Sequence, residues 1–310
     1  MRVAFFGAPE PAVSALRELL AAPDVEVVAV VTNPDRPSGR GQRLAPPPVK
    51  VLAQKAGVPV WQPVKAREVL SELVALAPDA CAVVAYGALL PRDVLDAGGV
   101  GFVNLHFSLL PAWRGAAPVQ AALLAGDTEA GVTCFVLEEG MDTGPVLATA
   151  RTPVREGETA GELVARLAEL GAPVLVEAVR GLVEGIITAR PQDHDQATYA
   201  PKIAPDDALL DWTREASVLE RAVRAFNPAP GAHTTLNGGR LKIYRTLLTG
   251  SLAGSRPGEV AAVEDGLPVV ACGTGGLVLA EVQPAGKPRM SGADLLNGYR
   301  PLGRVLGLQR

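Results

Sequence analysis

Short apolar runs alternate with helix-like stretches through the first hundred residues of the chain. RVAFFG, VEVVAVVT (25–32), ACAVVAYG and GFVNLHF are apolar at nearly every position, as strands buried on both faces are. Stretches with helical spacing, around 49–56 and 66–77, lie between them. This alternation predicts an α/β fold with a Rossmann-like, mostly parallel sheet that is covered by helices on both sides.

The pattern changes after Leu105. A loop with proline and glycine is followed by a helix, two strands and further helices, near 117–125, 131–138, 146–153 and 159–184. The stretch that comes next is polar, contains prolines and shows little periodicity, which is typical of a linker. A chain of 310 residues also favours two domains. We therefore expect a first domain over 1–188 and a linker over 189–206.

The remaining residues, 207–310, read as a small β domain. A helix near 214–226 precedes five or so short strands, which are bounded by Asn-Pro, Asn-Gly-Gly and Pro-Gly turn signals. Short strands at this density predict a C-terminal antiparallel β-barrel of the OB-like kind.

Composition excludes several classes of protein. The chain is 48% hydrophobic and 20% charged, as packed globular proteins are. Cys81, Cys134 and Cys272 are far apart, so zinc and disulfide frameworks are not indicated and reduced, buried thiols are expected. Glu10 interrupts the first apolar run too early for a signal peptide, and no run has the length of a membrane span. A cytoplasmic protein without membrane contact is expected.

Charge is unevenly distributed along the chain. The formal net charge is −4, which argues against a simple nucleic-acid-binding protein. Residues 205–310 nevertheless hold 12 Lys and Arg against 10 Asp and Glu, a net of +2, whereas 1–204 hold 17 against 23, a net of −6. A mildly basic tail on an acidic body is compatible with a polyanionic partner.

The first strand and helix do not form a dinucleotide site. Their turn, Gly7-Ala-Pro-Glu-Pro11, lacks the second and third glycines that let backbone approach a pyrophosphate. Glu10 would also place negative charge where a helix N-terminus receives phosphate. We interpret this turn as a structural connection.

The strongest candidate site is Asn104-Leu105-His106, at the end of a predicted strand. Alternation along a strand places Asn104 and His106 on one side, with Leu105 facing the other way. An amide and an imidazole in one crevice could stabilise an oxyanion, although an isolated Asn-x-His is more often a histidine satisfied by local backbone contacts. The loops SLLPAWRG, EEGMDTG with Asp142, and YGALLP follow neighbouring strands, and an aspartate that meets a histidine can set its protonation state. His194, in the linker, is expected to be exposed, and His233 to be structural.

These residues carry a family resemblance. NLHFSLLPAWRGAAPVQ followed by EEGMDTG is similar to the N10-formyltetrahydrofolate-dependent formyltransferases, and the combination is highly specific. Within that group the chain resembles the methionyl-tRNA formyltransferases over essentially its full length. Further signs are NPDRPSGRGQRLAPPPVKVLA (33–53), GDTEAGVT (126–133), ATYAPKI (197–203) and LDW (210–212). The turn Gly7–Pro11 departs from the family pattern, since we expect a sequence like G-T-P-D-F there, and a substrate contact from this turn is therefore in doubt.

The resemblance implies a reaction and a catalytic set. The α-amino group of initiator methionyl-tRNA would attack the formyl carbon of N10-formyltetrahydrofolate, the co-substrate, to support translation initiation. Asn104 and a protonated His106 would stabilise the charge that develops on the formyl oxygen. Asp142 would keep His106 charged and help to remove the proton from the amine. No metal is expected, because the chain has no His and carboxylate cluster at metal-binding spacing.

The resemblance also implies where folate binds. Main-chain groups of the loops 86–90 and 138–142 would read the pterin, and apolar side chains would form the walls of the site. For the leucines, plain core packing is an equal alternative. The expected folate-binding residues are Tyr86, Gly87, Leu89, Leu90, Ser108, Leu109, Leu110, Pro111 and Glu139.

A basic segment, 35–50, is the expected tRNA contact. It holds three arginines and one lysine against one aspartate, and it is too long for a simple connection between a strand and a helix. A solvated charged loop is the alternative. Its position near the strand ends favours contact with acceptor-stem phosphates through Arg36, Arg40, Arg43 and Lys50. We expect the protein to be a monomer.

Three other kinds of formyl-group enzyme share the catalytic set: glycinamide-ribonucleotide formyltransferases, sugar-nucleotide N-formyltransferases and formyltetrahydrofolate hydrolases. The first generally lack the C-terminal domain and the basic segment, and the second leave the basic segment unexplained. A non-catalytic RNA-binding protein would tolerate loss of Asn104, His106 and Asp142, and all three are present.

Overall fold

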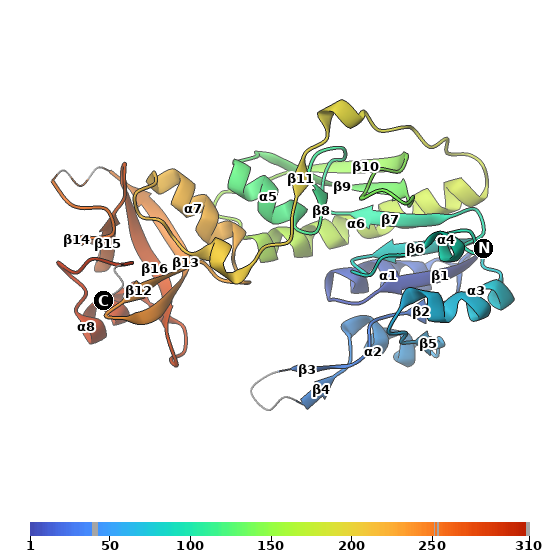
Figure 1. Cartoon of the computed structure of the whole chain (residues 1–310), viewed down its shortest axis with the longest axis horizontal. Coiled ribbons are helices and arrows are strands. Elements are labelled where there is room, and N and C mark those ends of the chain that lie inside the picture. The colour runs from blue at the N-terminus through green and yellow to red at the C-terminus, as the bar shows by residue number, and fades with distance from the viewer. Residues whose placement is uncertain (39–42, 251, 253, 308–310) are drawn as a thin grey trace. The chain divides into compact units, whose positions relative to one another are not determined.

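The computed structural model describes residues 1–38, 43–250, 252 and 254–307, and for Ser38 and Arg43 it describes the backbone alone. The chain folds as two compact units (Figure 1). The N-terminal unit comprises Met1–Pro118, Glu129–Pro153 and Val164–Pro201. The C-terminal unit comprises Val119–Thr128, Val154–Leu163 and Lys202–Arg310.

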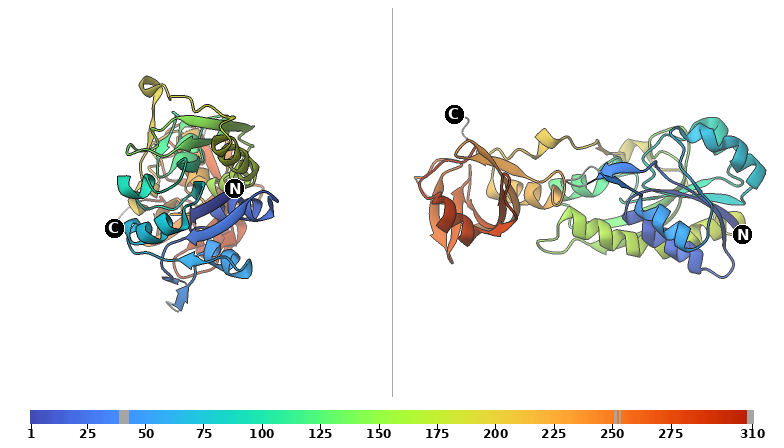
Figure 2. Two further views of the ribbon diagram at one scale, coloured as in Figure 1. Left: turned by 90° about the vertical axis from the view of Figure 1, so that its right-hand side faces the viewer. Right: turned by 90° about the horizontal axis from the view of Figure 1, so that it is seen from below.

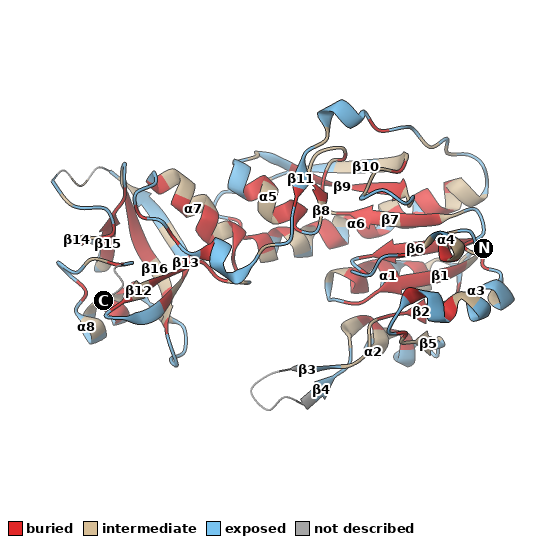
Figure 3. Ribbon diagram, viewed as in Figure 1, coloured by how far each residue is buried: buried red, intermediate tan, exposed pale blue. Residues whose placement is uncertain are grey.

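A seven-stranded sheet forms the centre of the N-terminal unit, in the order β10-β9-β7-β6-β1-β2-β5. Five strands are parallel: β1 (Arg2–Gly7), β2 (Glu26–Val31), β5 (Val60–Trp61), β6 (Ala80–Val84) and β7 (Phe102–His106). Two antiparallel strands extend one edge: β9 (Glu129–Val136) and β10 (Val146–Pro153). The central strands are buried on both faces (Figure 3), which confirms the mostly parallel, doubly covered sheet that their apolar runs predict.

Helices cover both faces of this sheet. Helices α1 and α6 lie on one face and α3 and α4 on the other (Figure 2). The side chains of β1 follow this division: Ala4 and Phe6 join the same core cluster as Leu73 of α3 and Val94 of α4. The bounds are α1 (Pro11–Ala21), α2 (Pro48–Lys55), a 3-10 turn (Ala66–Val69) before α3 (Leu70–Leu76), α4 (Arg92–Leu95) and α6 (Ala160–Val183). Helices α2, α3 and α6 lie within a few residues of their predicted positions, and α1 follows β1 as the predicted first helix does. No periodic pattern predicts α4.

The order of the strands fixes where a ligand would bind. From β1 the chain proceeds outward to β2 and β5, and it then returns to β6 on the other side of β1. The strand order therefore reverses between β1 and β6, and in open α/β sheets ligands bind beyond the carboxyl ends of the strands at such a reversal. The loop after β6 lies at this point, and β7 is the next strand in the sheet.

Two short strand pairs were not expected from the sequence. The basic segment contains a hairpin of β3 (Arg36–Ser38) and β4 (Arg43–Ala45). Within the N-terminal unit, β8 (Arg114–Gly115) pairs in parallel with β11 (Tyr199–Ala200). Arg190 also exchanges two backbone hydrogen bonds with Val146, at 2.7 and 2.8 Å. Main chain between 190 and 200 is thus bonded to the loops at the carboxyl edge of the sheet.

The C-terminal unit is built on an antiparallel sheet in the order β12-β13-β16-β15-β14, with β17 paired to β16, and the sheet curls as a half-barrel (Figure 1). This confirms the predicted antiparallel, barrel-like fold. Its strands are β12 (His233–Leu236), β13 (Gly239–Thr249), β14 (Val260–Glu264), β15 (Leu267–Ala271), β16 (Gly276–Pro284) and β17 (Met290–Ser291). Its helices are α7 (Ala216–Ala225) and α8 (Gly292–Tyr299), together with α5 (Pro118–Ala125) from Val119 on.

The three cysteines are unpaired and buried, as expected. Burial raises the pKa of the Cys134 and Cys272 thiols to about 12 and raises that of Cys81 as well, so these thiols stay protonated. No helix among the described residues is long and apolar enough to cross a membrane.

A tryptophan and a threonine make a buried polar contact in the core of the C-terminal unit. Trp212 Nε1 donates to Thr234 Oγ1 at 3.0 Å, and both residues are buried. Removing either partner leaves a buried polar group unsatisfied, which is more costly than the bond itself is stabilising.

We therefore expect Trp212→Phe and Thr234→Val each to lower the free energy of unfolding. Their double variant should show a coupling of about 1 kcal/mol, because the two changes remove the same hydrogen bond. Urea unfolding followed by circular dichroism measures all four proteins. Strictly additive effects would contradict the contact.

Candidate active site

Strand β7 presents two polar side chains on one side and an apolar one on the other. Leu105 packs against Gly171 of α6, where a Cβ would lie only 2.9 Å from the leucine methyl carbons, so the glycine allows the helix this close approach. Asn104 and His106 therefore face away from α6, as strand alternation predicts. Asn104 is half-buried, and its side chain makes no hydrogen bond to any residue that the structure describes. His106 is buried, with its ring edge-on to Phe135.

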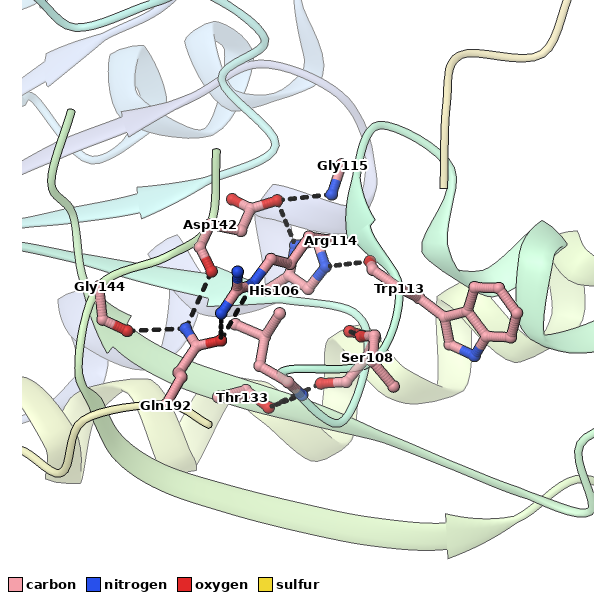
Figure 4. A network of polar contacts seen from close by, with 11 residues as sticks. His106, Ser108, Trp113, Arg114, Gly115, Thr133, Asp142, Gly144 and Gln192 are labelled. Atoms are coloured by element: carbon pink, nitrogen blue, oxygen red, sulfur yellow. Dashed lines mark hydrogen bonds and ion pairs between the residues drawn. The ribbon is translucent and has the colours of Figure 1, made fainter. Parts of the chain in front are cut away.

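Both ring nitrogens of His106 face oxygen atoms (Figure 4). Nε2 lies 2.9 Å from the carbonyl oxygen of Trp113, and Nδ1 lies 3.7 Å from Asp142 Oδ2. Because a carbonyl oxygen only accepts hydrogen bonds, Nε2 carries the proton in the neutral ring. In the imidazolium form the second proton is on Nδ1, which faces the Asp142 carboxylate. This arrangement accommodates the imidazolium form of His106.

Asp142 is held in place by main chain of the neighbouring loop. The backbone N–H of Gly115 donates to Asp142 Oδ2 at 2.7 Å (Figure 4). Asp142 lies between β9 and β10 and has a φ of +51°, which residues other than glycine rarely adopt. Loops from β7 and β9 thus converge on one point, as their positions after neighbouring strands predict.

The loop that follows β7 is held by hydrogen bonds from β9 and by one within the loop. Thr133 Oγ1 donates to the carbonyl oxygen of Ser108 at 2.7 Å and accepts from the Leu110 N–H at 3.1 Å. The hydroxyl of Ser108 donates to the Ala112 carbonyl at 2.6 Å, so it is already used inside the loop. Ser108 and Leu110 are buried, and the half-buried side chains of Leu109 and Pro111 are the ones that a ligand could contact.

Of the remaining residues expected to bind folate, some are buried and others are exposed. The Tyr86 ring is buried and packs at right angles on Phe6, with 5.5 Å between the ring centres, so its side chain belongs to the core. Leu90 belongs to the core as well, whereas Leu89 is 84% exposed. Gly87 and Glu139 are exposed.

Two residues that sequence reasoning missed join these loops. Arg114 is only 2% exposed, and its Nε and Nη2 donate to Gln192 Oε1 at 3.1 and 2.7 Å. Gln192 Nε2 in turn donates to the carbonyl oxygens of Asp142, at 2.9 Å, and Gly144, at 2.7 Å (Figure 4). Arg114 stands in the R-G of the motif and could have been suspected, but Gln192 lies in the segment that reads as a linker and has no sequence signal.

The two remaining histidines lie where they were expected. His194 is exposed, and its Nδ1 lies 3.1 Å from Arg114 Nη2. His233 is buried in the C-terminal unit, 3.0 Å from Arg240 Nη2. Burial, together with the charge of Arg240, lowers the pKa of His233, in keeping with a structural, neutral ring.

The basic segment is tied down at its base. Lys50 Nζ binds both carboxylate oxygens of Asp35, at 2.8 and 2.9 Å, and Gln62 Nε2 donates to Asp35 Oδ1 at 2.7 Å. These two partners hold the pKa of Asp35 below its ordinary value. Arg36 is exposed on β3. Arg40 and the side chain of Arg43 lie outside the described residues.

The described part of the chain has no group of three or more His, Cys, Asp or Glu side chains placed to hold a metal ion.

Gly115 tolerates substitution poorly. Its φ is +117°, and a Cβ would lie 2.7 Å from the carbonyl oxygen of Ala200. We expect Gly115→Ala to cost about 1–3 kcal/mol more than Gly57→Ala, which also has a positive φ (+72°) but no atom within 4 Å of the added carbon. Urea unfolding of the two variants measures the difference. Equal destabilisation would show that the contact with Ala200 does not matter.

The sequence is similar to known formyltransferases along its whole length. Residues 1–179 match the formyl transferase family, and residues 202–300 match the formyl transferase C-terminal domain. The chain is 49% identical over 315 residues to a methionyl-tRNA formyltransferase of Pseudomonas fluorescens, covering 99% of this chain and 98% of that protein. It is 48% identical over 303 residues to one from Desulfotalea psychrophila, covering 97% and 93%.

A solved structure has a similar fold. The N-formyltransferase from Helicobacter canadensis, in complex with folinic acid and dTDP-3-aminofucose, superposes with a TM-score of 0.68 over 91% of this chain and 98% of its own. At 17% identity this likeness concerns the fold alone. With two matching domains and close relatives along its whole length, the chain belongs to the formyl transferase family and, within it, to the methionyl-tRNA formyltransferases.

Proposed function

We propose that the chain transfers the formyl group of N10-formyltetrahydrofolate to the α-amino group of initiator methionyl-tRNA, for translation initiation. The observation that carries this proposal is the contact of His106 with Asp142 beside Asn104, in a chain that is nearly half identical to methionyl-tRNA formyltransferases over its whole length. The family is folate-dependent, and each residue of the expected catalytic set is present.

Asn104 and His106 are proposed to stabilise the formyl oxygen. As the amine attacks, the carbonyl π electrons move onto this oxygen, which becomes negatively charged. The Asn104 amide is half-buried and has no hydrogen-bond partner among the described residues, so its N–H groups are available to that charge. A protonated His106 contributes positive charge from the same side of β7.

Asp142 is proposed to take up the proton that the attacking amine loses. Its Oδ2 is occupied by the Gly115 N–H and faces His106, and its Oδ1 makes no hydrogen bond to the described residues. Oδ1 can therefore accept a proton from the amine directly or through one water molecule. When the tetrahedral intermediate collapses, the bond between the formyl carbon and N10 breaks, and the proton that Asp142 took up passes to N10 of the departing tetrahydrofolate.

Folate is proposed to lie against the loops after β6 and β7. Exposed Leu89 and half-buried Leu109 and Pro111 offer apolar surface, while the pterin is read by main chain of 86–90 and 138–142. Gly87 fits such a role, because it is exposed and no atom lies within 4 Å of the point where a Cβ would stand. Tyr86, Leu90, Ser108 and Leu110 are proposed to shape these loops rather than to touch the ligand with their side chains.

The basic hairpin is proposed to bind tRNA phosphates. Arg36, Arg40 and Arg43 are the phosphate contacts. Lys50 is proposed to hold the base of the hairpin in place, because its ammonium group binds Asp35 there. We further propose that 1–188 act as the catalytic domain, 189–206 as the linker and 207–310 as a tRNA-contacting domain, in a monomeric cytoplasmic protein that uses no metal.

The assay that tests this function compares acceptors. Purified protein is given N10-formyltetrahydrofolate with methionyl initiator tRNA, glycinamide ribonucleotide or amino-sugar nucleotides. Transfer to the tRNA alone is expected. Transfer to one of the other amines instead would overturn the acceptor and leave the folate chemistry in place, and no transfer to any amine would overturn both.

His106→Ala and Asn104→Ala should each lower kcat by about 10²–10³-fold, because the first removes positive charge beside the oxyanion and the second removes a hydrogen-bond donor to it. The dissociation constant for folate should change less than about twofold, because both groups act mainly in the transition state. Single-turnover kinetics and a folate-binding titration provide the two measurements. Unchanged turnover would show that the site is misplaced.

Arg40→Gln with Arg43→Gln should raise the KM for tRNA and flatten its dependence on salt. Each lost phosphate contact removes about 0.7–0.9 from the slope of log affinity against log salt. Arg17→Gln with Arg151→Gln, which removes two exposed charges elsewhere in the N-terminal unit, is the matched control. An equal effect of the two double variants would show that the hairpin arginines act only through the net charge of the protein and do not contact phosphates.

A further inference from the structure

One side chain from the polar segment 189–206 connects the two loops of the proposed catalytic site. Gln192 is 7% exposed, and all the hydrogen-bonding capacity of its amide is used. Its Nε2 donates to the carbonyls of Asp142 and Gly144, and its Oε1 accepts twice from Arg114 (Figure 4). An amide offers two N–H donors and two acceptor lone pairs, so this side chain is saturated by its four bonds.

Arg114 fixes the other end of this bridge. Its guanidinium is buried, and no carboxylate of the described residues lies within ion-pair distance. Its hydrogen-bond partners are the Gln192 oxygen and His194 Nδ1, and its backbone N–H donates to the Thr198 carbonyl at 2.8 Å. Arg114 is therefore anchored to the segment that contains Gln192 through both its side chain and its main chain.

The loop that contains Asp142 has little other support. Glu138, Glu139, Gly140 and Met141 are exposed. The positive φ of Asp142 is a conformation that persists only where the surroundings enforce it. The enforcing contacts are the Gly115 N–H on the carboxylate and the Gln192 amide on the carbonyls of Asp142 and Gly144. Gln192 thus joins the main chain of this loop to Arg114, the residue next to Gly115.

We propose that Gln192 is a positioning residue for formyl transfer, which holds the Asp142 carboxylate at His106 by bridging the Asp142 loop to Arg114. This inference rests on the proposed function for the role of Asp142. It assigns a polar segment outside the catalytic motifs a part in the reaction.

The chemistry of the bridge allows its two ends to be separated. Gln192→Glu keeps an acceptor for Arg114 and adds an ion pair with it, but it replaces the N–H donors by an oxygen that repels the carbonyls of Asp142 and Gly144. Gln192→Met removes both ends at similar volume. Gln196→Glu makes the same charge change in the same segment, at an exposed side chain that binds Asp193, and serves as the control.

Three measurements on the full chain test the proposal. In Gln192→Glu and Gln192→Met, kcat for formyl transfer to methionyl-tRNA should fall about 10–100-fold, as expected for a catalytic group displaced by about 1 Å. The KM for either substrate should stay within about twofold. Gln192→Glu should still unfold in one cooperative transition, at a lower Tm, because the carbonyls of Asp142 and Gly144 lose their donors. The NMR resonances of the Gly115 amide and the His106 ring should shift in both variants, because the first donates to Asp142 and the second faces it.

Turnover within twofold of the parent in Gln192→Glu would overturn the proposal. So would unmoved Gly115 and His106 resonances, or an equal loss of turnover in Gln196→Glu. If Gln192→Met does not fold, Gln192→Glu decides the matter. If the parent protein itself forms no formyl-methionyl-tRNA, the proposed function fails, and the two resonances then decide separately whether Gln192 positions Asp142.

Discussion

The hydrogen bond from the Gly115 N–H to the Asp142 carboxylate is the interaction on which the rest of the site depends. It requires the main chain at 115 to turn with a φ of +117° against the backbone of Ala200, which only a glycine permits. It also requires Asp142 to take a left-handed conformation. It directs one carboxylate oxygen at His106, while the other makes no hydrogen bond to the residues that the structure describes. The β8 and β11 pair, which brings 199–200 beside 114–115, is therefore as much a part of the site as the strand that contains Asn104 and His106.

A second constraint is the way in which polar groups are buried around this contact. Arg114, Gln192, Thr133 and Ser108 are buried, and each has its hydrogen-bond partners inside the protein. Such groups are rigid, because breaking any one of the bonds leaves an unpaired polar atom away from water. The Asn104 amide stands apart from them, half-buried and without a partner among the described residues. The site thus combines a fixed frame with a donor that is open to substrate.

The elements that could be predicted from the sequence are those with a regular pattern of apolar and polar residues. Apolar runs predict β1, β2, β6 and β7, and alternation along β7 predicts the shared side of Asn104 and His106. Contacts between residues far apart in sequence, such as Arg114 with Gln192, could not be predicted, because a buried glutamine in a polar segment looks like any exposed one. The direction of the Tyr86 ring could not be predicted either, because a side chain just after a strand can face a ligand or the core. The strands β3 and β4 are too short for an alternating pattern to be recognised. Glycines at 115 and 171 were visible in the sequence, but their reasons lie in Ala200 and Leu105.

A structure of the protein with a hydrolytically stable N10-formyl folate analogue tests the account most directly, because the proposal fixes where the formyl oxygen must lie. We predict that this oxygen lies within hydrogen-bond distance, about 3 Å, of Asn104 Nδ2 and on the His106 side of β7, with Asp142 Oδ1 open toward the formyl carbon. A formyl group bound away from Asn104, or an Asp142 carboxylate turned away from both His106 and Gly115 in the complex, would contradict it.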